Sequence, residues 1–390
     1  MEKSQLVRWS IMLLFLISIL YLGEAVASIS LGKAPDFTVF YGTARNILNG
    51  TNPYEDPTLF TGLGYPIVTG LGYVPFLLFP YTAAQTLFTV LSIVSIFLSL
   101  YVILKHLQVK SLSFAVLLFT PFIVFSFPTQ FTLGMGQSNF LAYAILLYSF
   151  HLFTQKKLYK GGILFGIAVI IKPLFIVLTL FFLLRKSWKF LFVTSSTVCI
   201  FVGITILSYG ITIYIYYLTE LIPHLLKISG REVYYNQGIT GFVARLIPDL
   251  AVRKMTANII SLSLLFFSLV WMRMRRFSDT AAFNLLLVVL VLVDSLAWQH
   301  HFVFLIFPFI TLSMRFWRQK NYTFLGVLFF SYLLISINIE LPQKIAFIPF
   351  LSHGFYGAVL LLTLALFSLG ESEPFKKMSR TNNARLNYNR

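Results

Sequence analysis

Long apolar runs are the feature that most constrains how this chain folds. The stretches Trp9 to Leu31, Phe190 to Tyr217 and Thr256 to Met272 are each long enough to cross a hydrocarbon core as a helix, which takes about 17 to 25 residues. Hydrophobic residues make up 58% of the chain and charged residues 11%, whereas about a quarter of the residues of a soluble domain are charged. This composition excludes a soluble globular domain and predicts an all-α polytopic membrane protein.

The hydropathy pattern predicts a bundle of about ten spanning helices. After the first apolar run, helices are expected over residues 83–104, 112–127, 139–153, 190–217, 256–272, 281–298, 302–314, 324–337 and 353–369, with a short outer loop over 129–138. Residues 1–370 are expected to form one transmembrane domain. Residues 371–390 are expected to form a basic cytoplasmic tail, and the polar composition of this tail predicts disorder.

Two segments break this pattern. Between Gly161 and Leu184, two apolar halves that are too short to span are separated by Lys172 and Pro173. We interpret them as a re-entrant helical hairpin whose broken tip is surrounded by protein, because irregular backbone is tolerated at membrane depth only in such a setting. A long outer loop, from residue 32 to about residue 73, follows the first helix. Long ordered loops usually carry function.

The distribution of charge predicts the orientation of the chain. The net charge is +17, and with the amino terminus inside, 21 of the 30 Lys and Arg residues fall on cytoplasmic segments. This bias follows the positive-inside rule. Basic loops are therefore interpreted as topology signals, and no nucleic-acid partner is expected. Most acidic residues fall on the outer side, so we expect a multi-pass plasma-membrane protein with both termini in the cytoplasm and its polar chemistry on the extracytoplasmic face.

The first outer loop contains a carboxylate suited to acid–base chemistry. Asp36 lies directly after the first helix, in the run Pro35-Asp36-Phe37-Thr38-Val39-Phe40-Tyr41. A carboxylate just outside the lipid is placed to remove a proton from an acceptor hydroxyl. The alternative is that Asp36 caps a short helix beginning at Phe37, as Asp often does.

Three further polar groups accompany this loop. The run from Asp294 to His301 ends a predicted span, where a buried carboxylate and paired imidazoles are costly unless they are used. Adjacent histidines on a helix point about 100° apart and make a poor chelate, so a structural hydrogen bond is the alternative role. A second run, from Gly134 to Asn139, places small residues and amides at the mouth of another span. Lys172 is a cation at membrane depth, able to offset an acidic head group or to pair with a carboxylate.

These motifs, in this order, resemble those of glycosyltransferase family 87. The family consists of integral-membrane enzymes of the GT-C architecture and includes polyprenyl-phosphate-mannose-dependent mannosyltransferases. The residues that carry the resemblance are Asp36, Tyr41, Ala44, Gly50, Pro53 and Tyr54, then Gly136, Gln137 and Asn139, then Gly162, Gly166, Lys172 and Pro173, then Asn236, Gln237, Gly241 and Arg245, and finally Trp298, His300 and His301. The chain departs from the family pattern at Leu296, where relatives commonly have Pro, and at Gly238, where Ser is usual. These departures bear on the donor sugar more than on the reaction type.

The resemblance implies an inverting glycosyltransferase. It would move a hexose, with mannose as the first choice, or a pentose from a polyprenyl-phosphate sugar to a glycolipid or glycan acceptor outside the cytoplasm. Asp36 would be the general base. The implied substrate-binding residues are Tyr41, Arg45, Tyr54, Gln137, Asn139, Lys172, Asn236, Gln237, Arg245, Trp298, His300 and His301. Among these, the histidines would contact the donor, and Lys172, Arg45 and Arg245 would offset the charge of the polyprenyl-phosphate leaving group.

No cofactor is expected beyond the lipid-linked sugar, which is a co-substrate. The sequence has no Asp-x-Asp pair and no His-Glu-x-x-His motif, and its single cysteine, Cys199, lies in an apolar helix, so no metal is expected. The main alternative is a transporter or flippase for a lipid-linked sugar, because intramembrane charge and broken helices also line substrate pathways. A structural scaffold would leave the long first loop and the histidine pair unexplained.

Overall fold

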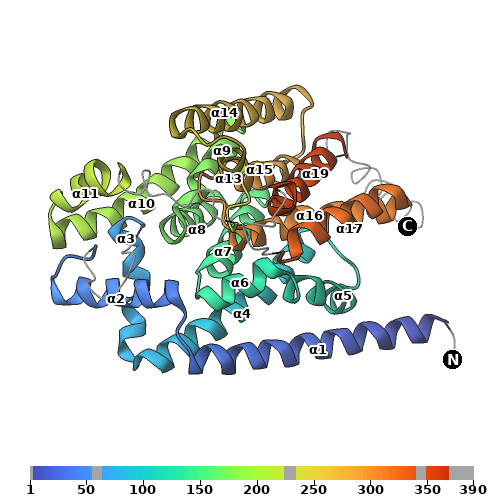
Figure 1. The fold of residues 1–390 in the computed structure, drawn as a ribbon, viewed down its shortest axis with the longest axis horizontal. Helices are drawn as coiled ribbons and strands as arrows, with labels where there is room; N and C mark the ends of the chain where they lie inside the picture. The colour runs from blue at the N-terminus through green and yellow to red at the C-terminus, as the bar shows by residue number, and fades with distance from the viewer. Residues whose placement is uncertain (1–2, 55–63, 224–233, 340–347, 369–390) are drawn as a thin grey trace, which may run out of the picture.

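The structure, a computed structural model, describes residues 3–54, 64–223, 234–339 and 348–368. Within these ranges the regular structure is helical (Figure 1), which confirms the all-α prediction. The helices are α1 (Lys3–Leu31), α2 (Pro35–Asn49), α3 (Ile67–Gly70), η1 (Leu71–Leu78), α4 (Tyr81–His106), α5 (Leu112–Val124), α6 (Phe127–Met135), α7 (Asn139–Thr154), α8 (Leu158–Ile171), η2 (Pro173–Leu178), α9 (Thr179–Leu184), α10 (Trp188–Tyr209), α11 (Thr212–Tyr216), η3 (Tyr217–Leu221), α13 (Ile239–Leu246), α14 (Leu250–Met274), α15 (Asp279–Val293), η4 (Gln299–Leu305), α16 (Ile306–Arg318), α17 (Tyr322–Ser336), α18 (Ile348–Leu351) and α19 (His353–Ser368). The predicted tail at 371–390 lies outside the described residues.

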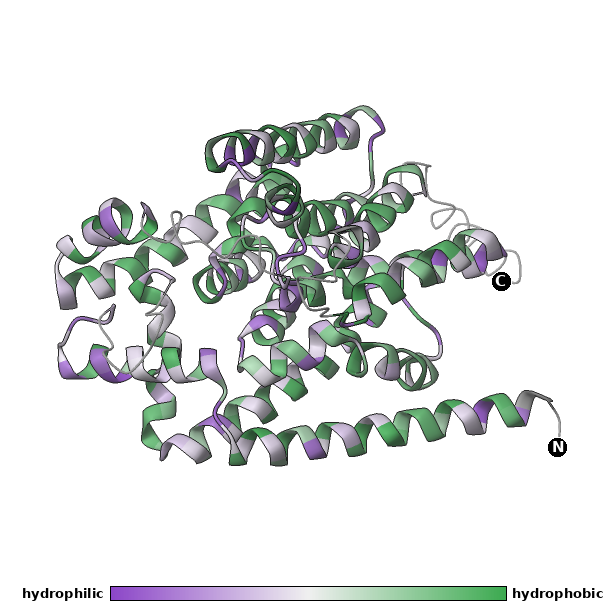
Figure 2. Ribbon diagram, in the orientation of Figure 1, coloured by the Kyte–Doolittle hydropathy of each residue, from purple (hydrophilic) through white to green (hydrophobic). Residues whose placement is uncertain are grey.

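The described helices include several that are suited to a membrane. Five are long and apolar enough to cross one: Gln5–Leu31, Tyr81–His106, Trp188–Tyr209, Leu250–Met274 and Gln299–Arg318. The pair α5 and α6 also passes that test together, although the two helices are bent by 70° at their break. Apolar residues predominate along the long helices α1 and α14 (Figure 2), and many of the apolar residues on α1 are exposed. The chain is therefore a polytopic membrane protein. A total of about ten spans, and the re-entry of the hairpin, stay predictions, because the other apolar helices have 10–17 residues.

Three predicted boundaries were wrong. The helix expected over 190–217 ends at Tyr209, where Gly210 has φ +75°. The outer loop expected over 129–138 is largely helix α6, because Pro128 lies in the first turn, where its fixed φ and missing N–H favour a helix start. The helix expected over 281–298 ends at Val293. There the carboxylate of Asp294 accepts bonds from the Leu296 backbone N–H, at 3.2 Å, and from His301, at 2.8 Å, and these bonds form a turn in place of another helical turn.

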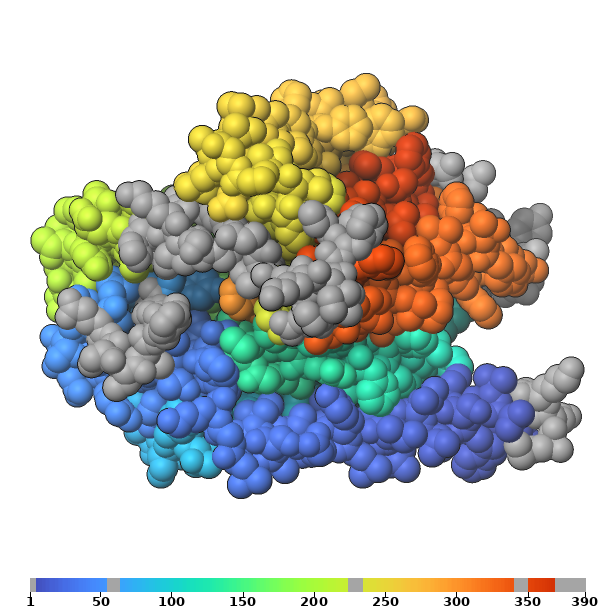
Figure 3. All heavy atoms as spheres, in the orientation of Figure 1, coloured from blue at the N-terminus to red at the C-terminus, as the bar shows by residue number. Residues whose placement is uncertain are grey.

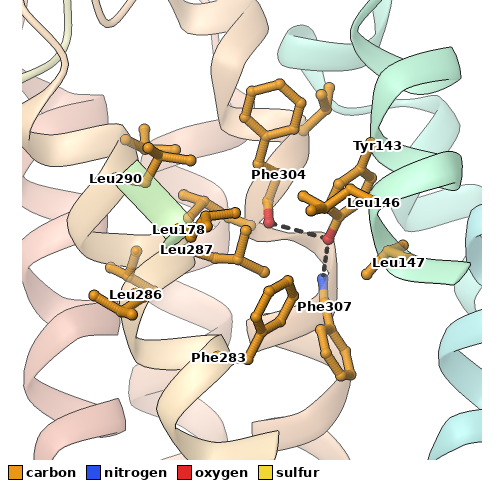
Figure 4. Close-up of a cluster of buried hydrophobic side chains, with 14 of the residues drawn as sticks. Tyr143, Leu146, Leu147, Leu178, Phe283, Leu286, Leu287, Leu290, Phe304 and Phe307 are labelled. Carbon is orange, nitrogen blue, oxygen red and sulfur yellow. Dashed lines mark hydrogen bonds between the residues drawn. The ribbon is translucent and has the colours of Figure 1, made fainter. Parts of the chain in front are cut away.

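The main core surrounds α15 and the break between η4 and α16. Helix α15 is apolar along its buried length except for Asn284, and it is buried from Ala281 to Leu292, as expected for a central helix. Figure 4 shows Tyr143 from α7 at the break, where its hydroxyl donates to the Phe304 carbonyl and accepts from the Phe307 N–H, both at 3.0 Å. The Phe304 carbonyl lacks a helical partner because residue 308 is proline. Tyr143 therefore stabilises the end of η4, the short helix that carries both histidines.

A second, aromatic core fixes the position of α2. Helices α2 and α11 lie at the same end of the molecule (left in Figure 1), and α3 and η1 pack against α2. The rings of Phe40 and Tyr73 stack with centroids 4.5 Å apart, and Tyr54 stacks on Tyr217 at 5.8 Å. Offset stacking of this kind adds about 0.5–1.5 kcal/mol per pair beyond burial. The first turn of α2 is thus anchored on a packed aromatic cluster.

Candidate active site

The corner between α1 and α2 places Asp36. Gln85 on α4 is 1% exposed, and its Oε1 accepts from the Ala34 backbone N–H at 2.9 Å. Its Nε2 donates to the carbonyls of Ile29 and Gly32 at 2.5 and 3.2 Å. One amide therefore supplies hydrogen-bond partners to backbone groups at both the end of α1 and the start of α2, where helix ends leave such groups unpaired. Our sequence analysis missed Gln85, although a glutamine in an otherwise apolar helix is a detectable signal.

Asp36 does not cap α2. The cap position is Ala34, which has no side-chain cap bond, and Asp36 lies inside the first turn. Its Oδ2 instead accepts a hydrogen bond from Gln137 Nε2 at 2.5 Å. The capping alternative is therefore wrong in this structure, and the carboxylate is free of any role in closing the helix end.

Gly136 directs Gln137 towards this carboxylate. Gly136 ends α6 with φ +69°, and the Gln137 N–H bonds back to the Thr132 carbonyl at 3.0 Å, as in a Schellman turn. A Cβ at Gly136 would lie 2.7 Å from the Cβ of Phe37. The position thus requires glycine both for its left-handed backbone and for the close approach of α6 to α2.

Lys172 extends the chain of contacts. It lies between α8 and η2, is 1% exposed, and donates from Nζ to the Tyr65 hydroxyl at 2.9 Å and to Gln137 Oε1 at 3.3 Å. Burial and the carboxylates of Asp36 and Asp294 raise the pKa of Tyr65, so its phenol stays neutral. A single Gln137 amide therefore links the buried cation of Lys172 to the half-buried carboxylate of Asp36.

Asp294 and both histidines lie near Lys172. Asp294 Oδ2 accepts from His301 Nδ1 at 2.8 Å, and the two histidine rings are 4.5 Å apart and nearly perpendicular. Asn139 Nδ2 donates to the His300 carbonyl at 2.9 Å, which ties η4 to the start of α7. Lys172 is within electrostatic range of Asp36, Asp294 and both histidines. The four predicted motifs that contain these residues therefore meet at one polar centre, hereafter the Lys172 cluster.

Several buried polar atoms in or beside this cluster have no hydrogen-bond partner among the described residues. They are Nε2 of His301, Nδ1 of His300, Oδ1 of Asn139 and both amide atoms of Gln299. Gln299 is 1% exposed and was not singled out by our sequence analysis. Native proteins rarely leave buried polar atoms unpaired, so each of these atoms needs a partner that the described chain does not supply.

The first-loop residues Tyr41, Arg45 and Tyr54 support the loop. The Tyr41 hydroxyl donates to the Phe79 carbonyl at 2.9 Å, and the Tyr54 hydroxyl accepts from the Ile67 N–H at 2.9 Å. Arg45 is exposed and lies over the ring of Tyr41, with 5.4 Å from Cζ to the ring centroid. Their predicted contacts with substrate stay predictions.

The later outer-loop motif joins helices together. Asn236 pairs with Trp298 in an isolated antiparallel bridge. Both ends of the Gln237 amide bond to the backbone around the start of α19, and Arg245 Nη1 donates to the Asn236 carbonyl at 3.0 Å. These bonds hold η4 against α13 and α19, and the expected substrate contacts of the four residues stay predictions.

No group of three or more His, Cys, Asp or Glu residues in the described part of the chain is arranged to hold a metal ion. The expectation that the protein needs no metal stays a prediction.

The chain matches the model of a known family. The model of glycosyltransferase family 87 matches residues 63–296, more than half of the chain. The chain belongs to glycosyltransferase family 87. The residues that match the family 87 model include Gln137, Lys172 and Asp294, whereas Asp36 precedes the match and the histidines follow it.

Two curated relatives are mycobacterial enzymes. Each is named a polyprenol-phosphate-mannose-dependent alpha-(1-2)-phosphatidylinositol mannoside mannosyltransferase. The protein from Mycobacterium tuberculosis is 24% identical over 312 residues, covering 73% of this chain and 71% of the relative. The protein from Mycolicibacterium smegmatis is 23% identical over 345 residues, covering 80% of this chain and 77% of the relative. No solved structure matches this family 87 chain, and the GT-C architecture stays a prediction. The protein is a membrane glycosyltransferase.

Proposed function

We propose that this protein is an inverting mannosyltransferase that uses polyprenyl-phosphate mannose and a glycolipid acceptor on the extracytoplasmic face. The observation that carries the proposal is the Lys172 cluster, in which a half-buried carboxylate and a buried cation are linked through one amide. The names of the two relatives support the lipid-linked mannose donor and an acceptor of the phosphatidylinositol mannoside type. Family membership favours sugar transfer over the transporter alternative.

In the proposed reaction Asp36 removes the proton of an acceptor hydroxyl. The acceptor oxygen forms a bond to the anomeric carbon while the bond from that carbon to the phosphate oxygen breaks. The polyprenyl phosphate leaves with the electron pair, and the configuration at carbon is inverted. Lys172 offsets the charge that develops on the phosphate, because a cation held in a buried site stabilises such charge far more than one in water.

The experiment that tests the function is transfer of labelled mannose by the purified protein in lipid nanodiscs. We expect transfer from polyprenyl-phosphate mannose to a phosphatidylinositol mannoside, and no transfer from a nucleotide-linked mannose. Transfer from a polyprenyl-phosphate pentose instead would keep the reaction and change the sugar. If no polyprenyl-phosphate sugar serves as donor, the proposed function is wrong.

The surroundings of Asp36 predict a shifted pH profile when Gln137 is replaced. Burial raises the pKa of the Asp36 carboxyl above its usual value, while the bond from Gln137 and the charge of Lys172 lower it in part. Gln137→Leu removes one of the two effects that lower this pKa, so the pKa of Asp36 rises further. As the pH falls, the carboxylate is then protonated, and no longer acts as a base, at a higher pH than in the wild type. We expect the acid limb of kcat/KM to move to higher pH.

Gln130→Leu is the matched control for this prediction, because Gln130 lies on α6, is not buried and does not contact Asp36. Its pH profile should equal that of the wild type. An unchanged profile in Gln137→Leu would show that the hydrogen bond does not set the pKa of the base.

The unpartnered atoms beside the Lys172 cluster suit sugar hydroxyls. Because His301 donates from Nδ1 to Asp294, its neutral ring presents Nε2 as an acceptor. With Oδ1 of Asn139 and Oε1 of Gln299, three acceptors stand beside the amide nitrogen of Gln299. A phosphate supplies only acceptor oxygens and would leave these three acceptors unpaired, whereas a sugar hydroxyl can donate to them and also accept from the amide.

Gln299→Leu separates recognition from folding. Removing a buried amide that lacks partners should leave the melting temperature unchanged or raise it. We expect the rate of transfer to fall at least about tenfold. The variant loses one hydrogen bond to the sugar, worth about 0.5–1.5 kcal/mol, and it also positions the sugar less well for the reaction. Melting curves and transfer rates measured on one preparation check this. A lower melting temperature with unchanged transfer would assign Gln299 to structure alone.

A further inference from the structure

The two glycines that precede Lys172 in its motif bring helices α8 and α10 together. A Cβ at Gly162 would lie 2.9 Å from the Phe190 carbonyl oxygen. A Cβ at Gly166 would lie 2.8 Å from the Cβ of Thr197. Residue numbers rise together in these two contacts, so α8 and α10 run in the same direction and begin at the same end. Lys172 directly follows α8, so the start of that helix lies about 20 Å from the Lys172 cluster.

Five exposed lysines gather where these two helices begin, and they are hereafter called the basic patch. They are Lys156, Lys157, Lys160, Lys186 and Lys189. Lys189 Nζ of α10 lies 4.0 Å from the centroid of the Tyr159 ring of α8, which joins the two turns. The neighbouring Arg185 is already paired with Asp279 at 2.7 Å, whereas no lysine of the basic patch forms an ion pair with another described residue. The basic patch therefore carries cations that the described chain does not neutralise.

Exposed apolar residues continue from the basic patch along both helices. Ile163 lies three residues after Lys160 and shares its face of α8. Phe192 lies three residues after Lys189 and shares its face of α10 in the same way. Both apolar side chains are exposed, and α10 is a candidate span in which 22% of the apolar stretch is buried inside the protein. Figure 3 shows the end of α10, with α11, in yellow-green at the left edge of the molecule. The basic patch therefore lies at the end of a surface that faces lipid.

Two aromatic residues mark the level of the lipid head groups. Tyr159 and Trp188 are exposed, and each lies in the first turn of its helix. Tyrosine and tryptophan are enriched where a membrane meets water, because their rings are apolar and carry one polar group. Lysine stems also lie along apolar surface while their charges reach the head groups. Cations, aromatic rings and apolar side chains thus follow one another in the order of the phosphate, glycerol and acyl parts of a phospholipid.

We propose that the basic patch binds the head group of an anionic phospholipid, whose acyl chains lie along Ile163 and Phe192. Basic surfaces between helices at the edge of a membrane attract anionic head groups. A soluble phosphate or an acidic protein would use the lysines alone, whereas a phospholipid also covers the exposed rings and apolar side chains. This lipid is distinct from the proposed donor and acceptor, because the basic patch and the Lys172 cluster lie at opposite ends of α8. The inference does not depend on the proposed function.

The test removes three charges from the basic patch in one variant that combines Lys157→Gln, Lys160→Gln and Lys189→Gln. Binding of dioleoyl-phosphatidylglycerol, which is anionic, and of dioleoyl-phosphatidylcholine, which is neutral overall, is measured on the purified protein in detergent. We expect the Kd for phosphatidylglycerol to rise at least about tenfold, because each lysine beside an anionic lipid contributes about fivefold in affinity. Binding of phosphatidylcholine and the melting temperature without added lipid should equal those of the wild type, since the three side chains are exposed.

The matched control removes three charges elsewhere, by combining Arg273→Gln, Arg275→Gln and Arg276→Gln. These arginines are exposed at the end of one helix, α14, and Arg275 lies over the Trp271 ring at 4.7 Å, so the control also loses a cation above an aromatic ring. Its Kd for phosphatidylglycerol should stay within about twofold of the wild-type value, because the basic patch is intact. Equal losses of affinity in both variants would mean that net charge alone attracts the lipid, and would overturn the site.

A second arm separates a lipid from a soluble phosphate. Phe192→Ser removes apolar surface beside the basic patch without changing its charge, and Phe266→Ser on α14 is the control, because Phe266 is also exposed. We expect Phe192→Ser to raise the Kd for phosphatidylglycerol at least about threefold, because the acyl chains lose apolar contact, and the control to match the wild type. Glycerol 3-phosphate, which carries a phosphate but no acyl chains, should bind far more weakly. If it binds as tightly as the lipid, or if Phe192→Ser has no effect, the assignment to a phospholipid is wrong.

Discussion

Asp36→Asn is expected to lower the rate of mannose transfer by about 10² to 10⁴-fold, the usual contribution of a positioned general base. The asparagine has the same shape, and its amide oxygen can still accept the bond that Gln137 donates to Asp36. It cannot take up a proton at neutral pH, so the acceptor hydroxyl keeps its proton during attack. The measurement is the initial rate of labelled mannose transfer in nanodiscs at saturating donor.

The matched control is Asp249→Asn. Asp249 is another carboxylate at the start of a helix, and it caps α14 by accepting from the Val252 N–H at 2.8 Å. Asparagine caps helices about as well as aspartate, so this variant should retain wild-type transfer and a wild-type melting temperature. Transfer that survives Asp36→Asn would keep the reaction but remove Asp36 from the role of base.

Lys172→Met is expected to lower transfer by about 10² to 10³-fold, the range seen when one preorganised electrostatic partner of a transition state is removed. Methionine keeps most of the length of the side chain but carries no charge. The leaving phosphate then develops its charge in a buried site without the cation that Lys172 supplied. The effect should fall mainly on kcat, with a smaller change in the donor KM, because the charge on the leaving oxygen grows in the transition state.

Lys189→Met is the control for this variant. Lys189 also lies over a tyrosine ring, with 4.0 Å from Nζ to the Tyr159 centroid, as Lys172 lies over Tyr65 at 5.3 Å. It is exposed and on a different helix, so its loss should leave transfer unchanged. A large drop in melting temperature together with near-normal transfer in Lys172→Met would mean that the lysine serves only to balance the neighbouring carboxylates.

The predicted site residues divide into two groups in the structure. Gln137, Asn139, Lys172 and the histidines come together with Asp36, in agreement with the motifs in which they occur. By contrast, Asn236, Gln237 and Arg245 bond mainly to the backbone that joins η4 to its neighbours. A motif indicates that a residue type matters at a position. It does not separate a side chain that faces a substrate from one that holds a loop, because both require polar atoms at fixed places.

Membrane residence, the helical class and the polar residue types follow from the sequence alone, because hydropathy acts over a single run of residues and needs no partner from elsewhere in the chain. The start of α6, where we expected a loop, could also have been predicted from the local sequence, because Pro128 lies in the first turn of the helix. Our sequence analysis missed this signal. Sequence alone does not reveal which polar residues meet.

Only the tertiary structure decided the composition of the Lys172 cluster. Gln137 reaches Asp36 across 101 residues, and Lys172 reaches Tyr65 across 107. Tyr65 and the corner residue Gln85 belong to none of the motifs, and they contribute through contacts that exist only once α2, α4 and α8 have packed. The physical reason is that a buried charge or amide is stable only beside its partners, and packing of distant helices chooses those partners.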